Sequence, residues 1–482
     1  MVYNRGSKGD WDRYAEVTGD SGWSWDNIQR YIVKNERFTP PADRHNTSGQ
    51  FDPSIHSFNG TNAVSLSGFN GYVLESAVLS ASQQLGGPFS FVLDYNSGSA
   101  LGFGWYQSTI NGANRSSAAV SYLHPALTRP NLHVLLNARV SRVLPTGSGE
   151  NSRDLNIKTV EFAQDIEDGP FIQLTATKEV ILSSGSVGTP HILLNSGIGN
   201  STTLSSLGKS VVFDLPSVGQ NVSVHPLTHP VFVVNSSITT EDPIFQNSSF
   251  RAELLQQWSE TGTGPLVKTR GTFNAQMRLD DDFIQKLGID PSSSPTSPHF
   301  TLVTQNSFYP LSPPNGSYLS FLILVDSPTS RGSITLSSSN PFSPPVIDVA
   351  CLETLFDLLA MRAAVKAVLE YTSTPAWEGY ILGPFTDLAN ATSSDDPEEL
   401  DKRLDDYIRA TTEPTGHIVG TASMSRKGAP FGVVDPDLAV KGIKGLRVVD
   451  ASVLPYVPSG HTQVPVYIVA ERAADLIKAQ WA

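Results

Sequence analysis

Helical patterns occur in four parts of the chain. In the first 35 residues, aromatic and aliphatic side chains lie three and four positions apart, and residues 353–373 repeat this spacing most strongly. Such spacing is typical of helices that bury one face. We also expect helices over residues 72–86 and over 393–411, because the second segment opens with Ser and Asp and has Pro near its start.

Alternating and β-branched residues predict strands between these helices. Residues 131–146 and 157–163 have this pattern. Residues 178–199 are typical of a strand, a Gly-Ser turn, a helix and a Gly stop, with the sequence "KEVILSSGSVGTPHILLNSGIG". A turn of this kind directs backbone N–H groups toward a phosphate or a flavin.

The pattern changes near residue 224. Buried strands are indicated by "HPVFVVN" and "SYLSFLILVD", with Pro- and Ser-rich breaks between them, so a second unit built on a sheet is expected.

Residues 38–70 are rich in Pro, Gly, Asn and Ser and predict a long surface loop. Loops of this length usually form lids or ordered covers.

Composition excludes several classes of protein. The chain has 482 residues, of which 39% are hydrophobic and 16% charged, as in ordinary globular proteins. A formal charge of −13 argues against a nucleic-acid binder. No stretch of about 18 apolar residues occurs, so no membrane span is predicted. The single cysteine, Cys351, excludes a disulfide framework and a Cys-rich metal site.

Glycosylation signals favour a secretory history. About four or five Asn-X-Ser/Thr sites are expected by chance. The polar N-terminal residues have no apolar core, so the chain as written carries no signal peptide. The chain has nine such sites, at Asn46, Asn59, Asn114, Asn200, Asn221, Asn235, Asn247, Asn315 and Asn390.

Two histidines are candidates for acid/base chemistry. His417 lies in "TTEPTGHIVGTASM" and His461 in "VPSGHTQVP", both in Gly/Ser turns at the edges of predicted elements. Alone, each could equally be a surface histidine. His225 and His229 lie four apart in "HPLTHP", but the prolines forbid a regular helix, so no metal pair is expected. No catalytic role is predicted for the other eight histidines, which are His45, His56, His124, His133, His191, His225, His229 and His299.

Several segments together resemble the glucose-methanol-choline (GMC) oxidoreductases, flavoenzymes that oxidise alcohols. These segments are "GSVGTPHILLNSGIG", "SRGSITLSSSNPFSPPVID", "HIVGTASM" and "HTQVPVYIVAERAADLI". Within the family the chain is most similar to fungal aryl-alcohol oxidases, through "MVYNRGSKGDWDRYAEVTGDSGWSWDNI" and "PPADRHNTSGQF". The resemblance covers essentially the whole chain.

The resemblance implies a mixed α/β fold with two domains. A Rossmann-like FAD-binding domain is expected over residues 1–223, with the extended loop at about 38–70. A substrate domain, an antiparallel sheet covered by helices, is expected over 224–385. Residues 386–482 would return to the FAD-binding domain and carry both candidate histidines.

One family motif does not occur in the sequence. Family members open with a βαβ unit whose G-x-G-x-x-G loop cradles the FAD pyrophosphate. No such motif occurs here. The chain is therefore expected to be N-terminally truncated, with roughly the first 80–90 residues of a family member missing, and a signal peptide would belong to that segment.

The resemblance also assigns candidate site residues. His417 would be the catalytic base, and His461 would hold the alcohol oxygen. Thr462 and Gln463 would lie beside the isoalloxazine ring, and Asp450 and Ala451 near the pyrophosphate and ribitol. Val140 would bond the adenine through its backbone. The alternative roles are strand packing for Val140 and a turn or helix cap for Asp450.

Two positions depart from the aryl-alcohol oxidase pattern. Those enzymes tend to have an aromatic residue before the catalytic histidine and Pro after it, where this chain has Gly416 and Ile418. In that family the aromatic residue helps oxygen approach the flavin. Its absence here therefore favours a quinone-type compound over O2 as the electron acceptor. Phe308 would contact substrate, whereas Tyr309 is expected to be a core residue.

The expected function is FAD-dependent oxidation of a primary, aromatic or allylic, alcohol to its aldehyde. Two alternatives remain open. One is a flavin-free scaffold that kept the fold, which the missing glycine motif favours and the retained pair of histidines disfavours. The other is a lyase- or cyclase-like relative that uses the histidines for proton transfer alone. Secretion is expected for the full-length form.

Overall fold

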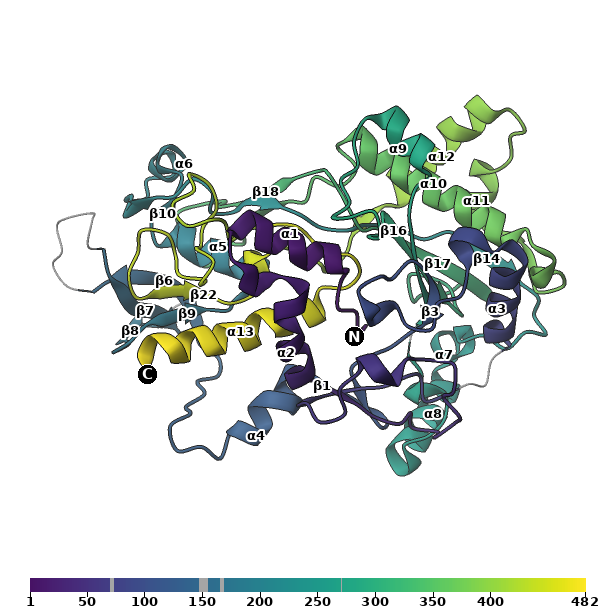
Figure 1. The fold of residues 1–482 in the computed structure, drawn as a ribbon, viewed down its shortest axis with the longest axis horizontal. Coiled ribbons are helices and arrows are strands. Elements are labelled where there is room, and N and C mark those ends of the chain that lie inside the picture. The colour runs from purple at the N-terminus through teal and green to yellow at the C-terminus, as the bar shows by residue number, and fades with distance from the viewer. Residues whose placement is uncertain (70–72, 147–154, 165–168, 270) are drawn as a thin grey trace.

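The computed structural model describes residues 1–69, 73–146, 155–164, 169–269 and 271–482 (Figure 1). The α-helices are α1 (Lys8–Thr18), α2 (Trp25–Asn35), α3 (Leu74–Leu85), α4 (His124–Ala126), α5 (Gly185–Asn195), α6 (Ser201–Ser206), α7 (Asp242–Gln246), α8 (Ser248–Thr261), α9 (Asp281–Leu287), α10 (Leu355–Thr372), α11 (Thr386–Ala391), α12 (Pro397–Thr411) and α13 (Gln463–Trp481).

The strands range from two to eight residues. They are β1 (Glu36–Phe38), β2 (Asn62–Val64), β3 (Gly102–Trp105), β4 (Ile110–Asn111), β5 (Asn114–Arg115), β6 (Arg139–Pro145), β7 (Ile157–Ala163), β8 (Ile172–Thr175), β9 (Val180–Leu182), β10 (Ile198–Gly199), β11 (Phe213–Asp214), β12 (Gln220–Val222), β13 (Pro226–Thr228), β14 (Val231–Val234), β15 (Gly271–Met277), β16 (Phe300–Gln305), β17 (Tyr318–Val325), β18 (Gly332–Thr335), β19 (Val346–Asp348), β20 (Ile381–Pro384), β21 (Glu413–Pro414) and β22 (Leu446–Val448).

The largest sheet has eight antiparallel strands. Its main path runs β20-β14-β17-β16-β15-β3, and β13 pairs with both β17 and β21. Every residue of β15 and β16 is buried, because both faces of the sheet are covered. One face packs against α3 and α10, and α12 packs on α10 in turn (Figure 1). The other face carries Val303 and Leu324 toward Val2, Tyr106 and Leu227.

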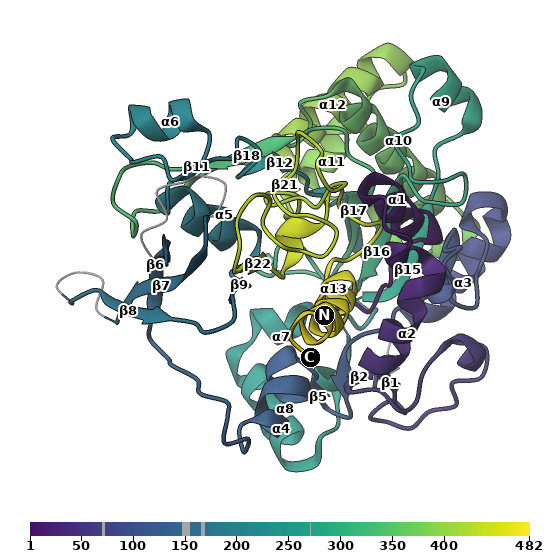
Figure 2. The ribbon, with the colours of Figure 1, turned by 60° about the vertical axis from the view of Figure 1, so that its left-hand side comes forward.

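A second core lies around α13. This helix packs against α2, and buried side chains of α1, α5 and the parallel pair β9–β22 join the same cluster. In Figure 1, α13 runs along the lower left lobe and its first turn points toward the large sheet. Figure 2 shows the N-terminus of the chain beside α13. The start of α13 therefore lies between the two cores.

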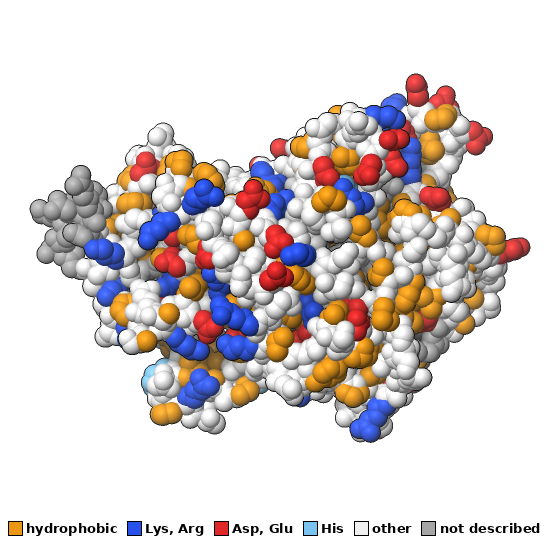
Figure 3. Space-filling view, viewed as in Figure 1, with side chains coloured by type: hydrophobic (Ala, Val, Ile, Leu, Met, Phe, Trp, Pro, Cys, Tyr) orange, Lys and Arg blue, Asp and Glu red, His pale blue; other side chains and the backbone are white. Residues whose placement is uncertain are grey.

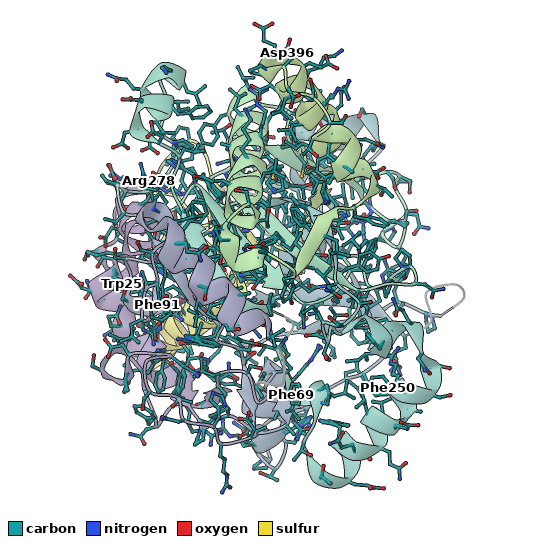
Figure 4. All side chains as sticks on the ribbon, turned by 90° about the vertical axis from the view of Figure 1, so that its right-hand side faces the viewer. Trp25, Phe69, Phe91, Phe250, Arg278 and Asp396 are labelled. Carbon is teal, nitrogen blue, oxygen red and sulfur yellow. The ribbon has the colours of Figure 1, made fainter. Side chains whose placement is uncertain are left out.

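Helix starts follow the signals in the sequence. The carboxylate of Asp396 caps α12 by accepting hydrogen bonds from the backbone N–H groups of Glu398 and Glu399 (Figure 4). The expected helices over 353–373 and 393–411 are α10 and α12, and the first 35 residues form α1 and α2. The helix predicted over 72–86 is α3, although residue 72 lies outside the described residues.

Two predictions are partly wrong. The strand predicted over 131–146 begins only at Arg139, because its partner β7 ends opposite that residue, at Ala163. The surface loop predicted over 38–70 ends early, because β2 pairs with β1 and residues 62–67 are buried. Residue 70 lies outside the described residues.

The cores do not follow the predicted division of the chain. Leu74 and Phe103, from the segment 1–223, lie in the core of the large sheet, as do Leu404 and Ile408 from 386–482. The division at 223 and 385 stays a prediction. The chain crosses between the two cores more often than that division implies.

Candidate active site

Three histidines meet between the two cores. The rings of His417 and His461 are 4.9 Å apart between centroids, in an edge-to-face arrangement. The ring of His225 lies 5.1 Å from that of His417, and the two Nδ1 atoms are 3.0 Å apart. The two predicted histidines therefore lie in one site, and His225 joins them.

Strand pairing brings His225 to His417. β21 pairs with β13 in antiparallel register, so the segment leading to His417 runs beside the segment that begins at His225. Thr415 donates to the carbonyl of His225 through its backbone N–H (3.2 Å) and through its hydroxyl (3.0 Å). Ser223 and Val419 exchange backbone hydrogen bonds beyond it. Hydrogen bonds therefore fix the chain on both sides of His417.

Two buried carboxylates hold the turn before His461. Asp10 accepts a hydrogen bond from the backbone N–H of Ser459 at 2.9 Å, and Asp326 accepts one from that of Gly460 at 3.1 Å. Gly460 has φ +88°, and a Cβ there would lie 2.4 Å from the Asn4 side chain. Only glycine fits this turn, which fixes where the His461 ring projects.

Burial keeps the imidazoles neutral. Removal from water disfavours the charged form of a histidine. Burial lowers the pKa of His417 to about 4 and lowers the pKa of His461 and of His225 well below the ordinary value. The histidines also repel one another's charge, which adds to the shift for His461 and His225. At neutral pH His417 is therefore a free base.

The sequence predicts no catalytic role for His225, whereas the structure places its fully buried side chain against His417. The "HPLTHP" segment itself indicates only two histidines four positions apart. Its partner is 192 residues away in the chain and becomes a neighbour only through β13 and β21. Within the described residues, no group of three or more His, Cys, Asp or Glu side chains is arranged to hold a metal ion.

The predicted pyrophosphate residues lie at the carboxyl ends of the parallel pair β9–β22. Asp450 follows β22, and its carboxylate accepts from the backbone N–H groups of Gly185 (3.0 Å) and Ser452 (2.9 Å) and from the Thr189 hydroxyl (2.6 Å). Asp450 thus acts as a cap that ties the start of α5 to the turn after β22. Ala451, half-buried, opens that turn.

The other predicted cofactor residues lie at the start of α13 and in β6. Thr462 is the N-cap of α13 and Gln463 its first residue, directly after His461. The Gln463 side chain accepts a hydrogen bond from Thr109 at 3.2 Å. Val140 lies half-buried in β6, opposite Phe162 of β7. These placements agree with cofactor contacts, which stay predictions.

The described residues fit the flavin and phosphate parts of FAD. Thr462 does not cap α13 with its side chain, so the first N–H groups of that helix are left for another acceptor, whereas at α5 the Gly185 N–H is already bonded to Asp450. Helix N-termini attract negative charge. A Cβ at Gly185 would meet open space, the buried Ser186 hydroxyl has no partner among the described residues, and neither has Nδ1 of His461.

The two aromatic candidates, Phe308 and Tyr309, have different surroundings. Phe308 packs edge-to-face on Tyr318 (5.1 Å) and Phe385 (5.5 Å), as a core residue would. Tyr309 instead lies 5.0 Å from the His229 ring and donates its hydroxyl to Glu413 at 2.7 Å. Substrate contact by Phe308 stays a prediction, and Tyr309 lies closer to the strands that carry the histidines.

Comparisons with known proteins establish the class. Two GMC oxidoreductase family models match the chain, the N-terminal one over residues 1–227 and the C-terminal one over residues 328–470. The chain therefore belongs to the GMC oxidoreductase family. FAD is the cofactor, and the activity is that of an oxidoreductase on substrates of the alcohol or sugar type.

The similar proteins include dehydrogenases and an oxidase. Dehydrogenase eriK of Hericium erinaceus is 42% identical over 99% of this chain and 79% of its own length. A pyranose dehydrogenase of Agaricus campestris is 39% identical over 99% of this chain and 78% of its own length. A solved fungal aryl-alcohol oxidase matches with a TM-score of 0.82 at 25% identity, covering 100% of this chain and 84% of that one.

The comparisons confirm the resemblance and the mixed α/β fold. None of the helices in the described residues is long and apolar enough to cross a membrane. On the face shown in Figure 3, basic side chains are interspersed with acidic ones.

Proposed function

We propose that the chain oxidises a primary alcohol, aromatic or allylic, to its aldehyde, with His417 as the base. The observation that carries the proposal is that His417 and His461, both held neutral by burial, lie together at the uncapped start of α13. The aryl-alcohol oxidase match supports the substrate class. FAD, when bound, supplies the acceptor for the hydride from the carbinol carbon.

The ring nitrogens of His417 and His461 have different surroundings, which suggests different roles for the two histidines. Nδ1 of His417 is engaged with His225, so Nε2 is the nitrogen left to take the hydroxyl proton. Nδ1 of His461 is buried without a partner among the described residues. A buried N–H without an acceptor is costly, so the His461 proton is expected on Nε2. From there it can donate to the alcohol oxygen and turn the carbinol carbon toward the cofactor.

Sugars are the second candidate substrates. Pyranose dehydrogenases of 36–39% identity match this chain over nearly its whole length. The same pair of histidines would serve a ring hydroxyl, because the chemistry at the carbinol carbon is the same. The distinction rests on the shape of the pocket around the histidines rather than on the histidines themselves.

A panel of alcohols tests the substrate class. We expect kcat/KM for a benzyl-type or allylic primary alcohol to exceed that for glucose at least about tenfold, since a site for a planar ring leaves sugar hydroxyls unpaired. Rates are measured with a quinone acceptor on protein loaded with FAD. A higher kcat/KM for the sugar contradicts the aromatic assignment and favours the second candidate.

The electron acceptor is proposed to be a quinone-type compound rather than O2. Gly416 occupies the position at which the aryl-alcohol oxidases have an aromatic residue, and a Cβ built there meets no atom within 4 Å. We expect Gly416→Phe to raise the reaction rate with O2 while the rate with quinone changes little.

Stopped-flow oxidation of the reduced protein by air-saturated buffer checks this, with Gly416→Ala as the matched control. Equal O2 rates in all three proteins would show that residue 416 does not govern the acceptor.

A further inference from the structure

His225 and Asp326 extend the site away from the substrate side. His225 is fully buried, with Nδ1 at 3.0 Å from Nδ1 of His417. Its other nitrogen, Nε2, has no hydrogen bond of good geometry among the described residues and lies 4.0 Å from Oδ1 of Asp326, and the backbone of Pro458 and of Asp326 also interacts with the ring. Three side chains, from the residue after β17, the β12–β13 connection and the segment after β21, therefore follow one another within contact distance.

The short contact between the two Nδ1 atoms fixes the tautomers. Of two imidazole nitrogens in a hydrogen bond, one must carry the proton and the other the lone pair. A base that accepts the alcohol proton on Nε2 must carry its own proton on Nδ1. His417 then donates to Nδ1 of His225, and the proton of His225 is left on Nε2, facing Asp326.

Asp326 is held rigidly in this position. The Thr301 hydroxyl donates to Oδ2 at 2.6 Å, and the Gly460 backbone N–H donates to Oδ1 at 3.1 Å. Asp326 follows β17 directly and is 1% exposed. Among the described residues, the charge of Asp10, which holds the same turn, also acts on it.

We infer that His225 and Asp326 are positioning residues of the proposed reaction: His225 sets the tautomer of His417, and Asp326 supplies the negative charge that balances its protonation. This inference rests on the proposed alcohol oxidation. It assigns a role to two residues that do not touch the substrate. In a buried site a fixed opposite charge stabilises the developing imidazolium far more than it would in water.

The proton balance is simple. His417 gains the alcohol proton at Nε2, and its Nδ1 proton can pass to Nδ1 of His225. The Nε2 proton of His225 can then pass to the carboxylate of Asp326 after a small approach from 4.0 Å. No group is oxidised or reduced in these steps. Burial raises the pKa of Asp326 to about 7, so both of its protonation states are populated near neutral pH.

The first test is the pH profile of the reductive half-reaction in Asp326→Asn. Asparagine keeps an acceptor for Gly460 and a partner for Thr301 but has no charge. We expect the wild-type rate to show an inflection near pH 7 that is missing in Asp326→Asn, with the rate above that pH reduced at least about tenfold.

Asp10→Asn is the matched control, because Asp10 is the other buried carboxylate that holds this turn. It can lower the rate by disturbing His461, yet it should keep the inflection, moved to lower pH because the Asp10 charge no longer raises the pKa of Asp326. Loss of the inflection in Asp10→Asn, or its survival in Asp326→Asn, would overturn the role assigned to Asp326.

The second test needs neither substrate nor cofactor. In protein labelled with 15N-histidine, two-bond 1H–15N spectra report which ring nitrogen carries the proton, and His225→Gln and His417→Gln variants assign the signals. We expect the His417 proton on Nδ1 and the His225 proton on Nε2. The reverse pattern overturns the inference even if the enzyme oxidises alcohols. If the expected tautomers are found in a protein that oxidises no alcohol, only the proposed function is rejected.

Discussion

At the residue scale, the site depends on imidazoles that stay neutral in a buried place. A histidine at the surface would be half-protonated near pH 6.5. Burial lowers the pKa of His417 to about 4, so its lone pair is available over the whole neutral and mildly acidic range. The same burial removes water that would compete for the alcohol oxygen.

This shift predicts activity at acidic pH. We expect kcat/KM of Asp326→Asn, which lacks the carboxylate that titrates near pH 7, to hold at pH 5.5 and to fall only as pH approaches 4, because His417 is protonated there and can no longer act as a base. Steady-state rates between pH 4 and 8 check this, with unfolding monitored at each pH by circular dichroism. A fall centred near 6.5 in folded protein would show that His417 is not shielded from water.

The sequence identified some of these residues and not others. His417 and His461 could be predicted because each lies in a recognisable local segment. His225 could not, because its role depends on the pairing of β13 with β21. Asp326 is likewise defined only by contacts with Thr301 and Gly460, which are distant in the chain. Local patterns do not report such long-range contacts.

At the element scale, one loop is held by a buried charged network. His56 lies in the loop between β1 and β2, and its ring nitrogens contact Glu36 and, at 2.8 Å, Asp94. Arg5 also pairs with Glu36. Because both ring nitrogens face carboxylate oxygens, both must donate, so His56 is protonated. Although burial acts against the charge, the hydrogen bonds to Asp94 and Glu36 raise the pKa of His56.

The anchor of this loop should weaken at alkaline pH. A histidine whose pKa is raised on folding contributes stability that is fully present below its unfolded pKa of about 6.5. That contribution is lost as pH rises through the folded value. We therefore expect hydrogen exchange of the amides in residues 39–61, corrected for intrinsic rates, to become faster with rising pH.

His56→Gln is the control, because glutamine has no charge to lose over this range. Its corrected exchange should already be fast at pH 6 and should change little with pH. Identical pH dependence in the two proteins would mean that His56 does not anchor the loop.

Element boundaries also show what the pattern of residues can decide. The helices α10 and α12 were predicted within a few residues, because their apolar spacing and end signals agree. The segment 131–138 has a strand pattern but no strand opposite it among the described residues, and Leu136 is 71% exposed. A strand needs a neighbouring strand to pair with, and the sequence of the segment does not show whether one lies beside it.

At the scale of the whole molecule, the site forms where two cores meet. The large sheet supplies Thr301 and Asp326, whereas α13 and the turn before it supply His461. The expected fold class could be predicted because motifs extend along the whole chain. The way the chain crosses between the cores could not, since β3 and α3 join the sheet from an early part of the sequence.

We propose that the protein is secreted and glycosylated. Six of the nine Asn-X-Ser/Thr asparagines are exposed, and the other three, Asn200, Asn221 and Asn235, are half-buried. We expect expression through a eukaryotic secretory pathway to give a product whose mass falls on treatment with an endoglycosidase that removes N-linked glycans. No change in mass would remove the support that these sites give to secretion.

The central claim is that this chain oxidises an alcohol with FAD and uses His417 as the base. The most direct measurement is anaerobic mixing of the FAD-loaded protein with a benzyl-type alcohol while the flavin absorbance near 450 nm is followed. We predict bleaching in the wild-type protein and in the control His124→Ala, an exposed histidine of α4. His417→Ala should bleach about 10²- to 10⁴-fold more slowly. No bleaching with any alcohol, or equal rates in His417→Ala and wild type, would contradict the account.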